Sequence, residues 1–121
     1  MSWDIELYER ENGEQPVAEF IKGLPKKHQA KAIRSIELLA EFGPALMLPH
    51  ARAIHGKEYQ GLWELRVQFA NDISRIFYFA PIGKTFVLLY GFIKKTNETP
   101  ISELERAKRY RDDYLRRCTD E

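Results

Sequence analysis

The sequence has one cysteine, no long hydrophobic run and no strong surplus of either charge. Because Cys118 is the only cysteine, no internal disulfide can form, and we expect it to be a free cytosolic thiol. No segment approaches the roughly 18 to 20 apolar residues of a membrane span, and the first residues lack the basic and apolar blocks of a signal peptide. These absences predict a cytoplasmic protein that does not enter membranes.

The familiar catalytic and metal-binding motifs are also missing from the sequence. There is no His-Glu-x-x-His motif, no cysteine pair, no glycine-rich phosphate loop and no Gly-x-Ser-x-Gly elbow. His50 and His55 are five residues apart in a segment without periodicity and without a third ligand, as is typical of loop histidines. We therefore expect no metal and no cofactor.

The length and composition are those of one domain. The chain has 121 residues, of which 44% are hydrophobic and 31% charged, so a single domain over residues 1–121 is predicted. Although 19 Lys and Arg nearly balance 18 Asp and Glu, residues 50–96 carry seven basic and three acidic side chains. An anionic partner would therefore be bound locally, not over the whole surface.

The first half of the chain has a strand pattern followed by two helix patterns. Apolar and polar residues alternate over residues 3–8, which predicts a half-buried strand. Residues 16–23 and 25–43 have apolar spacings of three and four between Pro and Gly boundaries, and the short link between them predicts a helix hairpin. A short edge strand is expected near residues 51–54.

The second half is dominated by strand patterns. Residues 62–69, 73–79 and 85–93 are rich in aliphatic and aromatic residues and are separated by turn sequences, so they predict a three-stranded antiparallel meander. Thr99 and Pro100 are suited to the start of a last helix, which is expected to end near Arg117. The sequence therefore predicts an α+β fold.

Side-chain alternation sorts the meander into two faces. With residues 70 and 73 paired across the first turn, Gln68 lies opposite Arg75, and Arg75 lies opposite Tyr90. One face is almost wholly apolar and is predicted to carry the helix hairpin: Trp63, Leu65, Val67, Phe69, Ile76, Tyr78, Val87, Leu89 and Ile93. The other face is apolar at one end and polar at the other: Glu64, Arg66, Gln68, Arg75, Phe77, Phe79, Phe86, Leu88, Tyr90, Phe92 and Lys94.

Two arginines that lie so close on one face repel each other unless an anion lies between them. In one interpretation Glu64 pairs with Arg66 or Arg75 and the cluster is only a solvated face. In the other, the cluster is a phosphate-binding concavity whose aromatic rings stack on bases, formed by Arg66, Arg75, Tyr90, Lys94 and Lys95. Both interpretations remain open at this point.

Several motif pieces, taken together and in order, resemble one toxin family. They are Leu62-Trp63-Glu64-Leu65-Arg66, Ser74-Arg75-Ile76-Phe77-Tyr78, the run from Leu88 to Thr96, Thr99-Pro100 and the helix from Glu103 to Ala107. These pieces look like the phage-derived HigB-like branch of the RelE/ParE toxin superfamily. The resemblance implies a RelE-like α+β fold, with an antiparallel sheet, an N-terminal helix hairpin on one face and a C-terminal helix.

The resemblance also implies a function. It implies the toxin of a type II toxin–antitoxin pair, an endoribonuclease that cleaves mRNA on the ribosome and so inhibits translation. The implied partners are the ribosome, mRNA and a cognate helix-turn-helix antitoxin, with which the toxin could form a heterotetramer. Arg66 and Arg75 match basic positions of the family motif, and the segment 92–95 matches its aromatic and lysine positions. Relatives also use a C-terminal tyrosine, for which Tyr110 and Tyr114 are candidates.

Such a nuclease needs a base, a cation and an acid to transfer the phosphate to the ribose 2′-OH. Arg66 and Arg75 suit the cationic role, Glu64 and His55 are candidates for the base, and Lys94 or Tyr90 could be the acid if its pKa were lowered. The predicted catalytic residues are Arg66, Arg75, Glu64 and Lys94. The predicted RNA-binding residues are Lys95, Tyr90, Phe92, His55 and Lys57.

Two other functions fit the same fold. A ParE-like relative would inhibit DNA gyrase without nuclease activity, and a non-catalytic RNA-binding module would not arrest growth. An mRNA cleavage assay separates the nuclease from both.

Overall fold

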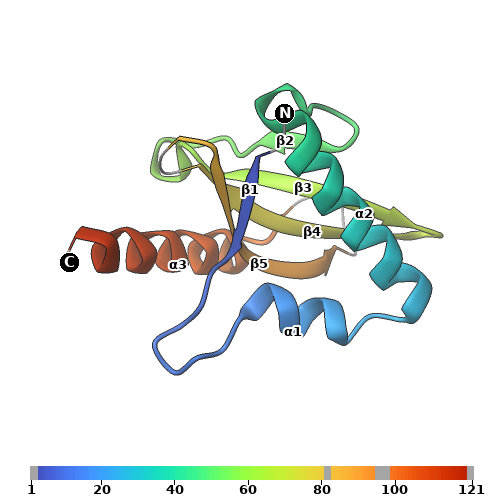
Figure 1. The fold of residues 1–121 in the computed structure, drawn as a ribbon, viewed down its shortest axis with the longest axis horizontal. Helices are drawn as coiled ribbons and strands as arrows, with labels where there is room; N and C mark the ends of the chain where they lie inside the picture. Colours follow the sequence, from blue (N-terminus) through green and yellow to red (C-terminus); the bar gives the residue numbers. More distant parts are fainter. Residues whose placement is uncertain (1–2, 81–82, 95–98, 120–121) are drawn as a thin grey trace.

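A five-stranded sheet lies between two helical layers in the computed structural model, which describes residues 3–80, 83–94 and 99–119 (Figure 1). The sheet has the order β1-β5-β4-β3-β2, with β1 parallel to β5 and the other neighbours antiparallel. This confirms the predicted α+β fold. The elements are β1 (Asp4–Leu7), α1 (Pro16–Lys22), α2 (Lys26–Phe42), η1 (Gly43–Ala45), β2 (Ala51–Ala53), η2 (Lys57–Tyr59), β3 (Trp63–Phe69), β4 (Asp72–Phe79), β5 (Thr85–Lys94) and α3 (Ile101–Thr119).

The end of α2 is fixed by a glycine and by the first strand. Gly43 has a φ of 57°, which ends the helix, and a Cβ at this position would collide with the indole ring of Trp3. The Trp3 N–H donates a hydrogen bond to the Ala40 carbonyl at 2.7 Å. The first strand is therefore anchored to α2 as well as to β5.

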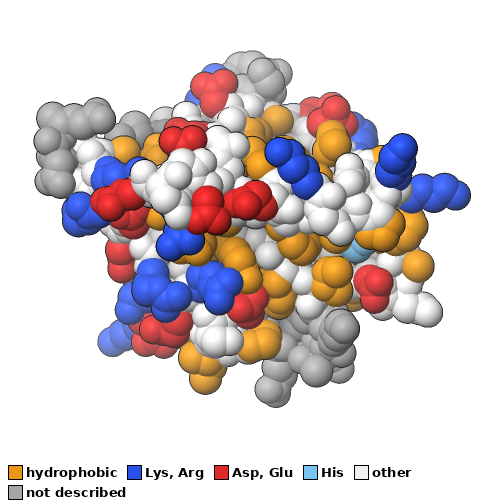
Figure 2. Space-filling view, turned by 90° about the horizontal axis from the view of Figure 1, so that it is seen from below, with side chains coloured by type: hydrophobic (Ala, Val, Ile, Leu, Met, Phe, Trp, Pro, Cys, Tyr) orange, Lys and Arg blue, Asp and Glu red, His pale blue; other side chains and the backbone are white. Residues whose placement is uncertain are grey.

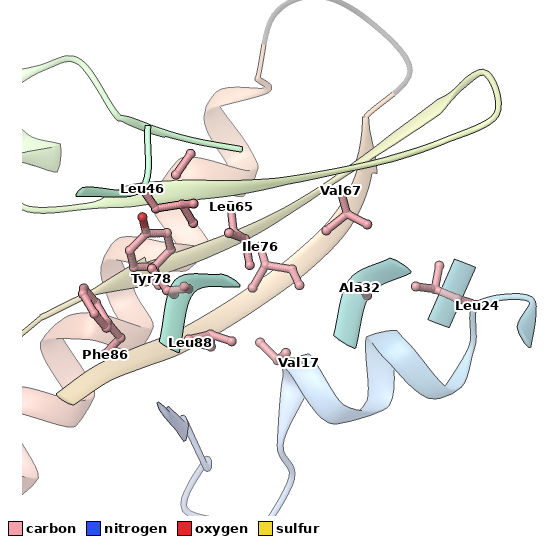
Figure 3. Packing of buried hydrophobic residues seen from close by; sticks show 12 residues of the cluster. Val17, Leu24, Ala32, Leu46, Leu65, Val67, Ile76, Tyr78, Phe86 and Leu88 are labelled. Atoms are coloured by element: carbon pink, nitrogen blue, oxygen red, sulfur yellow. The ribbon is translucent and has the colours of Figure 1, made fainter. Parts of the chain in front are cut away.

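The helices α1 and α2 cover one face of the sheet and form the first core (Figure 3). Val17 of α1 and Ala32 and Leu39 of α2 are fully buried against this face. The sheet contributes Leu65, Val67, Ile76, Tyr78, Phe86 and Leu88. Across the same interface the buried His28 ring is hydrogen-bonded to Ser74 Oγ at 2.8 Å. The prediction that the helix hairpin packs on the face of Leu65 and Ile76 is confirmed.

The register between β3 and β4 differs from the predicted one by two residues. Phe69 pairs with Asp72 across a two-residue turn in which Ala70 has a φ of 55°, so Arg66 lies directly opposite Arg75. The prediction that Gln68 faces Arg75 is therefore wrong. A shift of two residues leaves every side chain on its face, so the predicted faces of these two strands are correct.

A bulge in β5 changes which of its side chains face the hairpin. Phe77 pairs with Tyr90 but Tyr78 pairs with Leu88, so Leu89 is an extra residue in β5. Before the bulge the alternation is reversed: Phe86 and Leu88 join the first core, and Val87 and Leu89 face α3. The predicted faces of these four residues are therefore wrong, and Arg75 lies opposite Phe92, not Tyr90.

The helix α3 covers the apolar end of the second face. There Phe77, Phe79, Val87 and Leu89 form a second buried core with Ala107 of α3. Side chains at helical spacing along α3 complete it, namely Leu104, Tyr110 and Tyr114. The sequence predicted the helix but not the face that it covers. The polar end of the same face carries the charged side chains.

Candidate functional site

Four charged side chains come together on the α3 face, and we call them the arginine cluster: Arg52, Glu64, Arg66 and Arg75. In the strand register, Arg52 of β2 lies opposite Glu64 of β3, and Arg66 of β3 lies opposite Arg75 of β4. Because paired residues in adjacent strands point to the same face, the four positions form two neighbouring rows. The cluster thus spans three strands.

Glu64 is the internal counter-ion of the cluster. Its carboxylate is completely buried, and Oε1 accepts a hydrogen bond from Arg52 Nε at 2.5 Å and lies 3.4 Å from Arg75 Nε. The predicted pairing of Glu64 with Arg75 is confirmed, but the interpretation of the cluster as only a solvated face is wrong, because both side chains are buried. Arg52 was missed, although the edge strand expected near residues 51–54 contains it, because its alignment with β3 could not be derived from the sequence.

Arg75 is a buried cation with only 4% of its surface exposed. Burial lowers the pKa of its guanidinium, the Glu64 carboxylate opposes that shift, and the charges of Arg66 and Arg52 add to it. Among the described residues, Arg75 Nη1, Arg66 Nε and Glu64 Oε2 are buried without a hydrogen-bond partner. Three cations therefore share one anion, and part of their hydrogen-bonding capacity is unused.

The cluster is bordered by aromatic rings from β4 and β5. Phe92 lies opposite Arg75 in the register, and its ring stacks on Phe77 at 5.5 Å between ring centroids and on Tyr90 at 6.4 Å. Phe92 is half-buried, whereas Phe77 is fully buried. A flat ring in the same row of the sheet as two arginines is an arrangement that can hold a base near its phosphate.

Tyr90 is bound to α3. Its hydroxyl accepts a hydrogen bond from Arg106 Nη1 at 2.8 Å, and Arg106 Cζ lies 4.7 Å from the ring centroid. Burial is the main reason that the pKa of Tyr90 is raised, and the carboxylate of Glu103 raises it further. The lowered pKa required of a general acid is not found at Tyr90.

The two C-terminal tyrosines are also engaged in packing. Tyr110 stacks on Tyr8 with 4.9 Å between centroids, and the Tyr114 hydroxyl donates a hydrogen bond to Glu6 at 3.0 Å. Both belong to the second core. Their positions therefore tie α3 to the region of β1.

The remaining predicted site residues are distributed differently. Lys94 lies opposite Ile73 in the register, one row beyond Phe92, and Lys95 lies outside the described residues. His55 and Lys57 border an open groove of about 550 Å³ next to Trp63, beyond the end of β2. Arg66 of β3 lies near the other end of β2, where its backbone N–H donates a hydrogen bond to the His50 carbonyl at 2.7 Å. His55 and Lys57 are therefore separated from Arg66.

Within residues 3–80, 83–94 and 99–119, no group of three His, Cys, Asp or Glu side chains is arranged to hold a metal ion. No helix in this part of the chain is long and apolar enough to cross a membrane. On the face seen in Figure 2, acidic and basic side chains are interspersed.

The fold and cluster define an α+β protein with a buried, partly uncompensated arginine site beside an aromatic ring. Residues 19–112 match the phage-derived protein Gp49-like family (DUF891), and the match spans α2, the strands β2 to β5 and most of α3. The chain belongs to this family. No curated protein matches it at a significant level.

Proposed function

We propose that this protein is the toxin of a type II toxin–antitoxin pair and acts as a ribosome-dependent mRNA endoribonuclease. The observation that supports the proposal most directly is the direct cross-strand pair Arg66 and Arg75, next to Phe92, in a member of the Gp49-like family. The resemblance of the meander motifs to HigB-like toxins supports the same function. Arginine is suited to this site because its planar fork matches the geometry of a phosphodiester.

The proposed reaction is an internal phosphoryl transfer. The ribose 2′-oxygen attacks the neighbouring phosphorus, the bond from phosphorus to the 5′-oxygen breaks, and the products are a 2′,3′-cyclic phosphate and a free 5′-hydroxyl. A base takes the proton of the 2′-OH, and an acid protonates the 5′-oxygen. Arg66, which is half-buried, would neutralise the charge of the pentacoordinate phosphorus, with Arg75 behind it.

The candidates for the base and the acid are less favourably placed than the arginines. Glu64, the first candidate for the base, is fully buried and engaged by two arginines, and His55 lies beyond the far end of β2. Lys94, one row from Phe92, is our candidate for the acid. Because acid–base assistance is weak, the rate would depend on how the codon is oriented, and a ribosome supplies that orientation as effective concentration.

The proposed partner is a cognate antitoxin that covers the arginine cluster. The proposed antitoxin segment is acidic or apolar, and an acidic one would relieve the repulsion between Arg66 and Arg75. The product of the adjacent open reading frame is the candidate. If it neither binds the protein nor protects cells that express it, the toxin–antitoxin proposal loses its main support.

The test of the activity is incubation of the purified protein with one message, in the presence and absence of translating ribosomes. We expect cleavage of the translated message, with new 5′ ends inside the reading frame, and little cleavage of naked RNA. Equal cleavage of both samples would contradict ribosome dependence. No cleavage in either sample would contradict the nuclease proposal.

The burial of Glu64 and the raised pKa of Tyr90 favour a second candidate, a non-catalytic RNA-binding module on the same fold. Such a module would bind RNA through the same arginines without producing new 5′ ends. It would also leave cell growth unaffected. A gyrase supercoiling assay with the same preparation separates a ParE-like activity from both.

A further inference from the structure

Arg52 is a solvent-facing cation that is held from one side only. Its Nε donates to Glu64 Oε1 at 2.5 Å, while 41% of its side chain is exposed. Among the described residues, neither Nη nitrogen of Arg52 has a hydrogen-bond partner. A guanidinium held through Nε keeps the edge formed by its two Nη nitrogens free, and this edge is the one that binds phosphate oxygens in pairs.

Glu64 is buried where a substrate cannot reach it, yet it contacts both the buried Arg75 and the partly exposed Arg52. Its Oε1 lies within 3.4 Å of Arg75 Nε and holds Arg52 Nε. One buried carboxylate thus sets the position of two guanidinium groups at once. The Glu64 carboxylate can therefore orient Arg52 and Arg75. It does not neutralise all three arginines, so an external anion can bind the remaining positive charge.

The charges of the cluster do not balance. Three arginines face one carboxylate, and Arg75 Nη1 and Arg66 Nε are buried without a partner among the described residues. Arg52 lies in the Glu64 row, and Arg66 lies in the next row of the sheet. Arg52 and Arg66 lie on different strands and in rows about 7 Å apart along the strands, so each can take its own phosphate. The cluster therefore suits a chain that carries successive phosphates.

We propose that Arg52 binds a second backbone phosphate of a single RNA strand, next to the phosphate bound at Arg66, and that Glu64 is the positioning residue that holds Arg52 for this contact. This inference rests on the proposed function, because it takes the ligand to be RNA. It adds a binding residue that the sequence did not indicate. It also assigns Glu64 a role different from that of a base.

The salt dependence of RNA binding tests the contact. For a single strand, the slope of log K against log salt falls by about 0.7 for each phosphate that the protein no longer neutralises. Labelled single-stranded RNA is titrated with the full chain at several salt concentrations, with fluorescence anisotropy as the readout. We expect Arg52→Gln to weaken binding about tenfold at low salt and to reduce the slope by about 0.7. Arg34→Gln is the matched control, because Arg34 is an exposed arginine on α2 that pairs with the exposed Glu37.

Glu64→Gln separates positioning from simple electrostatics. The substitution removes a negative charge, so a non-specific basic surface would bind RNA more tightly. A positioning role predicts weaker binding and a smaller slope, because a neutral amide oxygen holds Arg52 less firmly than the carboxylate does. Thermal unfolding shows whether this buried variant is folded, and if it is not, Arg52→Gln and Arg52→Lys decide the question. Arg52→Lys should recover the slope but not the full affinity.

The outcomes distinguish the inference from the proposed function. An unchanged slope for Arg52→Gln, with RNA binding still abolished in Arg66→Ala, overturns the role of Arg52 and leaves the RNA site in place. A reduced slope without cleavage on ribosomes supports the contact and contradicts the nuclease. If the wild-type chain does not bind free RNA, the role of Arg52 is overturned, and cleavage on ribosomes still decides the nuclease proposal.

Discussion

Arg66 and Arg75 are direct cross-strand partners on one face of the sheet, yet only Arg75 is buried, with 4% of its surface exposed. The register of β3 and β4 brings the two like charges together, and the buried Glu64 pairs with Arg75. An uncompensated pair of this kind is costly in a fold without a ligand to use it. The difference in burial gives the two arginines different expected responses to substitution.

We expect Arg66→Ala to reduce cleavage of translated mRNA about a hundredfold, the scale of losing one donor to the transition state. Stability should change little, because Arg66 is half-buried and has no ion-pair partner among the described residues. Cleavage and thermal unfolding are measured on the same preparation, with Arg34→Ala as the control. Full activity would remove Arg66 from the site.

Arg75→Ala should act on stability as well. It removes a buried cation next to a buried carboxylate, and breaking such a pair costs about 3 to 5 kcal/mol. The interpretation of the cluster as only a solvated face does not hold for Arg75, which is buried. Urea unfolding provides the free energy of unfolding, and a decrease of less than about 1 kcal/mol would contradict the burial of this pair.

Gly91→Ala should destabilise the first core by about 1 to 3 kcal/mol, because a Cβ at Gly91 would lie 2.5 Å from Phe20 Cδ2. Phe20→Leu should make the added methyl group less costly, so a double-mutant cycle would show coupling between the two positions. Gly23→Ala is the control, since its Cβ would make only ordinary contacts. Additive effects would show that α1 does not pack against Gly91.

Asp113 should make stability dependent on acidic pH. It accepts hydrogen bonds from Tyr8 Oη at 2.5 Å and from Arg117 Nη2 at 2.7 Å, and the bond from Tyr8 is the first cause that holds its pKa below the ordinary 3.8. Because the unfolded carboxyl takes up its proton at higher pH than the folded one, this stability is present above 3.8 and is lost as pH falls through the folded pKa. Urea unfolding between pH 2 and 6 measures it, and Asp113→Asn should remove this part of the pH dependence. An unchanged acid profile in that variant would exclude the carboxylate as its source.

The order of the elements could be derived from the sequence because it depends on local patterns. Alternation in β3 and β4 and the Pro and Gly boundaries of α1 and α2 are each set by a few adjacent residues. The faces of β3 and β4 followed as well, because alternation survives a register shift of two. Arg66 and Arg75 could therefore be assigned to one face before their exact partners were known.

Features that depend on distant contacts could not be derived. Nothing in the sequence of β5 indicates the bulge at Leu89, so the predicted faces of Phe86 and Leu88 were the reverse of the observed ones. The burial of Glu64 and its pairing with Arg52 depend on how a three-residue edge strand aligns with β3. The raised pKa of Tyr90 depends on α3, whose side of the sheet the periodicity did not indicate.

The most direct test of the central claim is to map mRNA 5′ ends in cells that express the wild-type chain or Arg66→Ala. The account predicts new 5′ ends inside translated reading frames with the wild-type chain and about a hundredfold fewer with the variant. Co-expression of the adjacent open reading frame should suppress them. An unchanged set of 5′ ends in cells whose growth the wild-type chain arrests would contradict the account and would direct attention to a target other than mRNA.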